Sequence, residues 1–265
     1  MKKLLIICLL INTSVLFSQT NSVDKIKSTG VKSLVTKSYS FENEKKYILE
    51  TKKFDFDSTG KVVKVNFDAP GYFDKIAYTY DLKGKEIEEK MYNNSKVVRS
   101  YKFEYNNSGK KIYSKSINNA DDVDMEVNYT YDEKGNLLQE ESISGNRKFG
   151  FKYTYDKNSR KTEMVAYNPT KIEKKFYYRY DDKGQLMEEK GYLYWAGAKN
   201  VKYNFYSQKS FTYNDNKEMI KMDYYISDVL FEKYLYFYND KGLLTKWERY
   251  STNDKLLYSV EYVYE

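Results

Sequence analysis

The sequence lacks histidine altogether and carries a single cysteine, Cys8, among its 265 residues. Without histidine the chain has neither a Ser-His-Asp nor a Cys-His nucleophilic system, and it has no histidine-based zinc site. It also lacks the glycine-rich sequences GxxxxGK and GxGxxG that bind nucleotide phosphates. These absences leave carboxylates as the only catalytic groups to consider, and no cofactor is expected.

The first 18 residues have the composition of a secretory signal peptide. Two lysines precede an apolar run that begins at Leu4, and small and polar residues follow Phe17. This run is too short to span a membrane comfortably as a helix. We therefore expect residues 1–18 to be removed on export to the periplasm, cell surface or extracellular space. The mature chain then has no transmembrane span and, because Cys8 is lost, no disulfide.

Charge gives little indication of a nucleic-acid partner. The chain has 45 basic and 38 acidic residues, and its formal net charge is +7. The two signs are mixed along the sequence, and no block of like charge resembles a nucleic-acid-binding arm. The charged residues are expected to form solvated faces.

A pair of aromatic residues separated by one position recurs nine times, mostly at intervals of 24 to 26 residues. The nine pairs are Phe54/Phe56, Tyr78/Tyr80, Phe103/Tyr105, Tyr129/Tyr131, Tyr153/Tyr155, Tyr178/Tyr180, Phe211/Tyr213, Tyr236/Tyr238 and Tyr262/Tyr264. A fixed period of this length is typical of repeat architectures. Side chains at i and i+2 share one face of a strand, so each pair predicts a β-strand.

A turn signal follows nearly every pair, as in DEKG at 132–135. An Asp or Asn side chain can bind the backbone two residues on, and Gly supplies the positive φ that closes such a turn. In two turns without glycine, Asn158 and Asn216 are expected to take the positive φ one residue earlier. A second run and a looser turn complete each repeat, which predicts a β-hairpin.

The predicted fold is therefore all-β: an antiparallel array of β-hairpins with repeats of about 25 residues, forming an open, spiralling or nearly single-layer sheet. Residues 19–53 are expected to form a lead-in with degenerate strands, and 54–265 the repeats. The high tyrosine content, 31 residues, suits a sheet face that is only half covered.

The phrases YTYDEKGNL (129–137) and YRYDDKGQL (178–186) resemble the YD repeat of Rhs-type proteins, over about residues 54–265. The resemblance implies hairpins that coil into a spiralling sheet, often a shell around a C-terminal toxin, and it implies an association with carbohydrate binding. No toxin or self-cleaving core follows the repeats here, so a short exported version with an open sheet is expected.

Acidic residues recur at the repeat period, in the doublets at 88–89, 140–141 and 188–189 and at the start of most turns. A repeated exposed position paired across strands explains the doublets better than a catalytic site, which is usually singular. One carboxylate per turn falls short of the ligand number of calcium, and the acids at 121, 122 and 124 lack the glycine and terminal Glu of a calcium loop. We expect no catalytic and no metal-binding residue.

One interval, from Tyr180 to Tyr213, is 33 residues long and contains GYLYWAGAKNVKYNFY (191–206). The insertion is either a longer hairpin whose rings pack together or a recognition site. In the second case its candidate ligand-binding residues are Trp195, Tyr192, Tyr194, Tyr203 and Tyr206. Trp247, at the strand position equivalent to Glu89 and Glu189, is expected to cover the sheet instead.

These patterns favour a non-catalytic exported protein that offers an extended aromatic and charged β-surface to a carbohydrate or a surface protein. The alternative is a structural envelope component that assembles through its sheet edges. A carboxylate-dependent glycosidase fits less well. An outer-membrane barrel also fits less well, because runs such as KEIEEKMY place charge on both faces and leave no continuous lipid-facing band. The oligomeric state is open.

Overall fold

The computed structural model describes residues 23–42, 45–68, 74–193 and 204–265. In these ranges a short helix, α2 (Val23–Thr29), precedes the strands. The strands are β1 (Ser33–Glu42), β2 (Lys45–Phe56), β3 (Val62–Asp68), β4 (Lys75–Tyr80), β5 (Glu86–Asn93), β6 (Lys96–Tyr105), β7 (Lys111–Asn118), β8 (Val123–Tyr131), β9 (Leu137–Ser144), β10 (Arg147–Tyr155), β11 (Lys161–Asn168), β12 (Lys171–Tyr180), β13 (Leu186–Leu193), β14 (Asn204–Tyr213), β15 (Met219–Ile226), β16 (Val229–Tyr238), β17 (Leu244–Ser251) and β18 (Leu256–Tyr264). The all-β prediction is confirmed.

The sheet is closed, which corrects the open array expected from the sequence. The 18 strands form one antiparallel sheet in which neighbours in sequence pair, and β1 also pairs with β18 from Leu34↔Tyr264 to Ser40↔Tyr258. The sheet is therefore a closed β-barrel rather than an open spiral or a nearly single-layer array. The physical reason is that an open meander leaves two edge strands with unpaired N–H and C=O groups, and the β1–β18 ladder satisfies both edges.

The tight turns form as predicted, with one difference. In the turn at 81–84, Asp81 Oδ1 accepts the backbone N–H groups of Lys83 and Lys85, and Gly84 has φ +74°. In the two turns without glycine, however, positive φ falls on Ser159 (61°) and Lys217 (63°), not on the asparagines before them. The turn fixes the left-handed position at its fourth residue, so the residue there adopts it at a modest cost.

A β-bulge follows each tight turn of the regular repeats. The register shifts between Thr79 and Tyr80, so that Tyr80 lies opposite Glu86 while Thr79 lies opposite Glu88. Ile87 is the extra residue, and its side chain is exposed. The bulge returns Glu86 and Glu89 to the same face of β5, although three positions separate them.

The chain divides into two compact units. Unit 1 contains the described residues up to 68 together with 213–221 and 234–265, and unit 2 contains 74–193, 204–212 and 222–233. In unit 1 a hydrophobic core forms around Leu34, Leu244 and Trp247, with exposed fractions of 0%, 0% and 5%. Ile26 of α2 is also buried, at 1%, so the helix is held by burial of its own apolar side chain.

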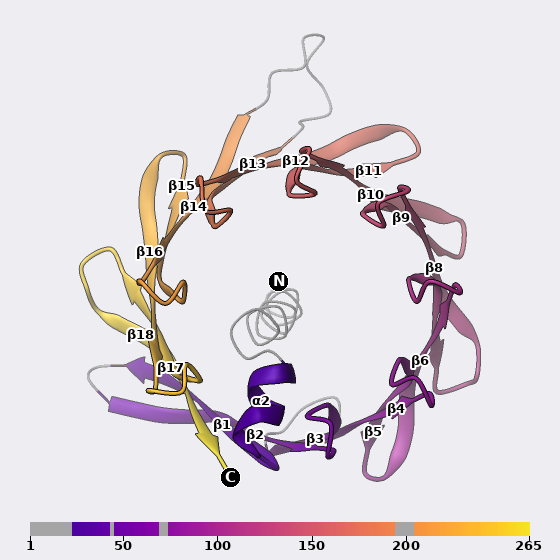
Figure 1. The fold of residues 1–265 in the computed structure, drawn as a ribbon, viewed down its shortest axis with the longest axis horizontal. Helices are drawn as coiled ribbons and strands as arrows, with labels where there is room; N and C mark the ends of the chain where they lie inside the picture. Colours follow the sequence, from indigo (N-terminus) through magenta and orange to yellow (C-terminus); the bar gives the residue numbers. More distant parts are fainter. Residues whose placement is uncertain (1–22, 43–44, 69–73, 194–203) are drawn as a thin grey trace. The chain divides into compact units, whose positions relative to one another are not determined.

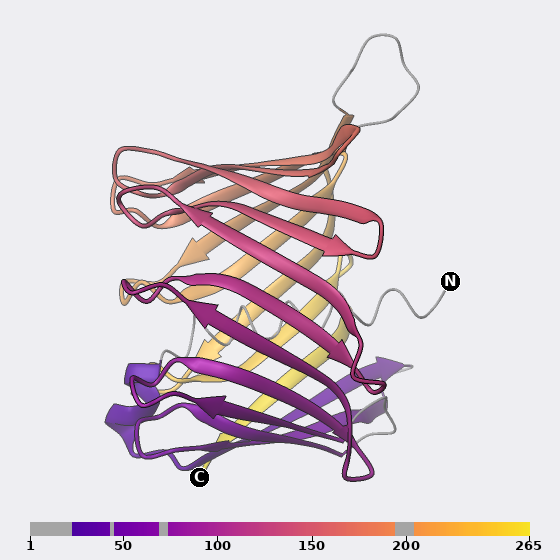
Figure 2. The same ribbon diagram turned by 90° about the vertical axis from the view of Figure 1, so that its right-hand side faces the viewer.

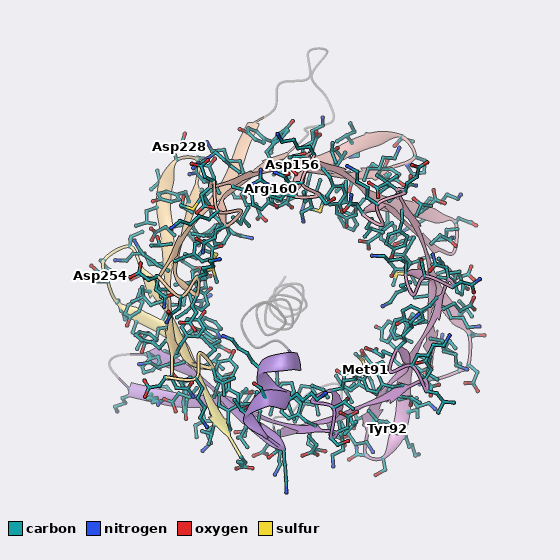
Figure 3. The ribbon with its side chains drawn as sticks, viewed as in Figure 1. Met91, Tyr92, Asp156, Arg160, Asp228 and Asp254 are labelled. Atoms are coloured by element: carbon teal, nitrogen blue, oxygen red, sulfur yellow. The ribbon has the colours of Figure 1, made fainter. Side chains whose placement is uncertain are left out.

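In unit 2 the strands from β4 to β13 form a curved sheet with hairpins side by side (Figures 1 and 2). Successive side chains alternate between its two faces, as Met91 and Tyr92 of β5 do in Figure 3. One face bears the aromatic pairs and is here called the aromatic face. Its rings are half-buried, whereas the residues between them, such as Thr79 and Thr154, are exposed on the other face.

Candidate functional site

Acidic and basic side chains alternate along the aromatic face of unit 2, between the strands that carry the rings. We call this set the charged row. Its members are Glu86 and Glu89 on β5, Lys111 on β7, Glu140 on β9, Lys161 on β11, Glu189 on β13 and Lys209 on β14. Each member lies on a strand that directly follows or precedes a tight turn, so the repeated hairpin generates the row.

The cross-strand register places most of these charges opposite a ring. Glu89 lies opposite Tyr78 and Tyr101, and Glu140 and Glu189 lie opposite the equivalent Tyr129 and Tyr178. Directly opposed side chains in an antiparallel pair have Cβ atoms about 5 Å apart. The charges are therefore set among aromatic rings rather than in open solvent.

The two acids in the middle of the row have partners of their own. Tyr153 donates its hydroxyl hydrogen to Oε1 of Glu140 at 2.6 Å. Lys209 Nζ lies 2.8 Å from Oε1 of Glu189. Both carboxylates are thus fixed in orientation by a neighbouring strand, which is the condition for a preorganised binding surface.

The lysines of the row lie over aromatic rings. Lys111 Nζ is 3.9 Å from the centroid of the Phe103 ring, and Lys161 Nζ is 4.2 Å from that of Tyr178. Burial lowers the pKa of both ammonium groups, and the acids of the row oppose this shift. Neither lysine has a carboxylate within ion-pair distance among the described residues, so each keeps donor capacity.

At the β5 end of the row two carboxylates share one lysine. Burial and, to a smaller extent, the charge of Glu86 raise the pKa of Glu89 to about 7, although Lys111 opposes this shift. Burial raises the pKa of Glu86 as well. Near neutral pH this end of the row therefore takes up a proton, and a protonated carboxyl donates a hydrogen bond as well as accepting one.

The other face of unit 2 carries ordinary surface ion pairs. Glu88 lies 2.8 Å from Lys90, and Glu163 lies 3.1 Å from Lys175. The glutamate doublets are therefore split between the two faces. Glu89, Glu140 and Glu189 lie on the aromatic face with the charged row, and their neighbours at 88, 141 and 188 lie on the other face. The prediction of one exposed, repeated position missed this division. The register of a tight-turn hairpin, with Glu89 opposite Tyr78, is the signal that could have found it.

The residues predicted for recognition are only partly described. Tyr194, Trp195 and Tyr203 lie outside the described residues, and so does the side chain of Tyr206. Tyr192 lies on β13, where its ring meets that of Tyr177 edge to face, with centroids 5.7 Å apart. This pair is on the face opposite the charged row, so the structure does not bring Tyr192 together with it.

Trp247 takes the place expected for it. It lies on β17 in unit 1 with an exposed fraction of 5%, and its ring is 5.2 Å from that of Tyr258 and 6.0 Å from that of Tyr234.

Within the described ranges no helix is long and apolar enough to span a membrane. In the same ranges no group of three or more potential ligands is placed to hold a metal ion.

No family model and no curated protein matches the chain. Solved structures that are similar to it include the Tc holotoxin pore of Photorhabdus luminescens, with a TM-score of 0.40 and 15% identity over 84% of this chain. The chain spans only 12% of that toxin chain. A porin-like protein from Bacteroides uniformis has a TM-score of 0.47 and 9% identity, covering 89% of this chain and 98% of that one. A Bacteroides fragilis protein of unknown function has a TM-score of 0.29 and 13% identity, covering 53% of this chain and 88% of that one.

Proposed function

We propose that the protein is a non-catalytic, exported binding protein that holds a carbohydrate against the aromatic face of unit 2. The observation that carries the proposal is the charged row, in which oriented carboxylates and lysines alternate among half-buried rings. Sugars combine an apolar C–H face, which stacks on aromatic rings, with hydroxyl groups that donate to carboxylates and accept from ammonium groups. A surface that interleaves these groups meets both requirements at once.

The arrangement favours binding over hydrolysis. A glycosidase needs one protonated and one ionised carboxylate within about 10 Å of each other. Glu89, Glu140 and Glu189 lie on strands four apart, which is roughly 19 Å along the sheet. Glu86 and Glu89 are neighbours on one face of one strand, whereas the two carboxylates of a glycosidase flank the scissile bond.

The closed sheet favours binding over the structural alternative. Assembly through sheet edges needs strands with unpaired backbone groups, and β1 and β18 satisfy each other instead. A protein partner remains the second candidate. It is favoured by Tyr177, which is 40% exposed beside Tyr192 on the face opposite the charged row.

The test is a glycan array probed with the purified chain, followed by calorimetric titration of the best glycan into matched variants. Lys161→Met should weaken binding by about tenfold, because it removes an ammonium donor from the row while keeping the length of the side chain. Lys175→Met is the control, since Lys175 lies on the opposite face and pairs with Glu163. Equal affinity of both variants would contradict the proposal, and release of a shortened glycan would favour the glycosidase.

A further inference from the structure

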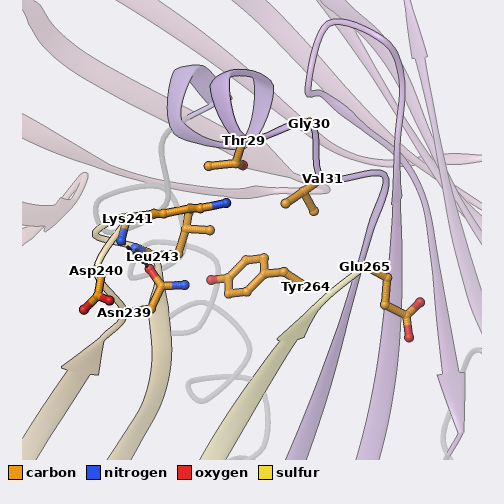
Figure 4. A pocket seen from close by; sticks show the side chains of 9 residues that line it. All are labelled: Thr29, Gly30, Val31, Asn239, Asp240, Lys241, Leu243, Tyr264 and Glu265. Carbon is orange, nitrogen blue, oxygen red and sulfur yellow. Dashed lines mark hydrogen bonds between the residues drawn. The ribbon is translucent and has the colours of Figure 1, made fainter.

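A cavity of about 520 Å³ lies in unit 1, between the end of α2 and the turn that joins β16 to β17 (Figure 4). Its upper wall is the segment from Thr29 to Val31, and its lower wall is the turn from Asn239 to Leu243 with Tyr264 beside it. Cavities of this size are typical of small-molecule sites. It is distinct from the charged row, which belongs to unit 2.

One lysine of the helix links α2 to the turn that forms the lower wall of the cavity. Lys25 Nζ donates to the backbone oxygen of Gly242 at 2.7 Å and lies 3.7 Å from Glu218. This contact fixes α2 over the turn, while burial of Ile26 anchors the helix to the core. The wall formed by residues 29–31 is therefore a fixed part of the unit.

Most polar groups of the lining already have partners. Thr29 Oγ1 donates to backbone oxygens of its own helix, and the hydroxyl of Tyr264 donates to the backbone oxygen of Leu244 at 2.6 Å. Oε2 of Glu265 accepts from Ser33 Oγ at 2.8 Å. These groups define the shape of the cavity but offer little to a ligand.

The polar groups that remain are mainly donors. Oδ1 of Asn239 accepts the backbone N–H groups of Lys241 and Leu243, so its amide nitrogen is left to donate. In Figure 4 the ammonium of Lys241 extends between Thr29 and the Tyr264 ring, whereas the Asp240 carboxylate points away from that ring. In the described part of the chain Lys241 has no ion pair. Val31, Leu243 and the Tyr264 ring supply the apolar part of the lining.

We propose that this cavity binds a small organic carboxylate with an apolar body. The carboxylate accepts from Lys241 Nζ and the Asn239 amide, and the body packs on Tyr264 and Val31. Because the cavity opens to solvent on one side and offers few donors, the expected Kd is on the order of 1 mM. This inference is independent of the carbohydrate proposal.

The repeat provides a matched control. The turn Asp181–Gly184 has the same sequence, Asp-Lys-Gly, at its last three positions as the turn 239–242, and its lysine is Lys183. It lies in unit 2, whereas the helix that walls the cavity belongs to unit 1. A carboxylate that binds merely to an exposed turn lysine would bind both turns equally.

The experiment is a titration of the whole ¹⁵N-labelled chain with phenylacetate and with its neutral analogue phenylacetamide, followed by NMR. Saturable shifts are expected at 29–31 and 239–243 with phenylacetate. Lys241→Met should weaken phenylacetate binding by about tenfold or more, while Lys183→Met leaves it unchanged. Val31→Trp should block binding by filling the cavity. The proposal is overturned if shifts appear equally at 181–184, if Lys241→Met binds as the parent chain does, or if no saturable shift occurs up to about 20 mM.

Discussion

Tyr153 of β10 donates to Glu140 of the neighbouring β9 at 2.6 Å, and both residues lie on the aromatic face of unit 2. Burial and this hydrogen bond together raise the pKa of the Tyr153 hydroxyl above its usual range. The bond fixes the Glu140 carboxyl group in a half-buried setting, where a polar group without a partner is costly.

Tyr153→Phe should therefore lower the free energy of unfolding by about 1.5 to 3 kcal/mol, since hydrogen bonds to charged groups are the stronger ones. Urea denaturation followed by fluorescence measures the change. Tyr178→Phe is the control at the equivalent position of the next repeat. Its hydroxyl has only a 4.0 Å contact with Met164 Sδ, so the loss should stay below about 0.5 kcal/mol. Similar losses in both variants would show that the hydrogen bond to Glu140 adds no more to the free energy of unfolding than the contact of Tyr178 does.

The stability of the chain should depend on pH through Glu89. Its pKa is raised from 4.5 to about 7 in the folded chain, so the folded state holds the proton more tightly than the unfolded state. This contribution is fully present below about pH 4.5 and is lost as the pH rises to about 7. Glu89→Gln should remove up to about 3 kcal/mol of that decline.

Denaturation curves at pH 5, 6, 7 and 8 would measure the slope of the free energy of unfolding against pH. The control is Glu88→Gln on the face opposite the charged row, where the carboxylate pairs with Lys90. If the slope is the same in Glu89→Gln as in the parent chain, the carboxyl is not protonated in the folded state.

The two tryptophans should behave oppositely. Trp247→Ala removes a ring packed between Tyr234 and Tyr258, and it should cost about 3 to 5 kcal/mol of stability without changing ligand affinity per folded molecule. Trp195 lies outside the described residues, and its role in recognition stays a prediction. If it anchors a ligand, Trp195→Ala weakens binding by about 2 kcal/mol and barely moves the melting temperature. Equal destabilisation with no effect on binding would assign both rings to packing.

Gly150→Ala should be poorly tolerated. A Cβ at this position would lie 2.2 Å from the backbone oxygen of Glu140 and 3.0 Å from the Tyr167 hydroxyl. The backbone oxygen belongs to the β9–β10 ladder and cannot move away, so we expect a loss of about 2 kcal/mol or more in chemical denaturation. Gly145→Ala meets no atom within 4 Å and is strained only by its φ of +55°, which should cost about 1 kcal/mol. A smaller loss at Gly150 than at Gly145 would contradict the register of this pair.

The local structure could be predicted from the sequence because its causes are local. The alternation of aromatic residues gives the strands, and Asp81 with Gly84 gives the turn between two of them. Closure could not be predicted in this way, because it depends on the pairing of Leu34 with Tyr264, at opposite ends of the described chain. No local pattern records the register of that ladder.

The charged row was missed for a related reason. Glu88 and Glu89 are adjacent and so lie on opposite faces, but which of them shares the face of the rings depends on the bulge at Ile87 and on the pairing with β4. The cavity that we propose to bind a small carboxylate depends on the hydrogen bond from Lys25 to the backbone oxygen of Gly242, and these residues are 217 positions apart in sequence. In both cases a residue contacts another segment of the chain, and the sequence around that residue does not determine which segment this is.

The β1–β18 pairing has a consequence for how such a chain changes in length. In a fully antiparallel sheet the first and last strands can pair antiparallel only if the number of strands is even, as it is here with 18. Each repeat contributes two strands, so duplication or deletion of a whole repeat preserves this parity. Gain or loss of a single strand would turn the closing ladder parallel and break its register. We therefore expect related chains to differ in length by whole hairpins. A relative with one repeat more or fewer is expected to close in the same manner.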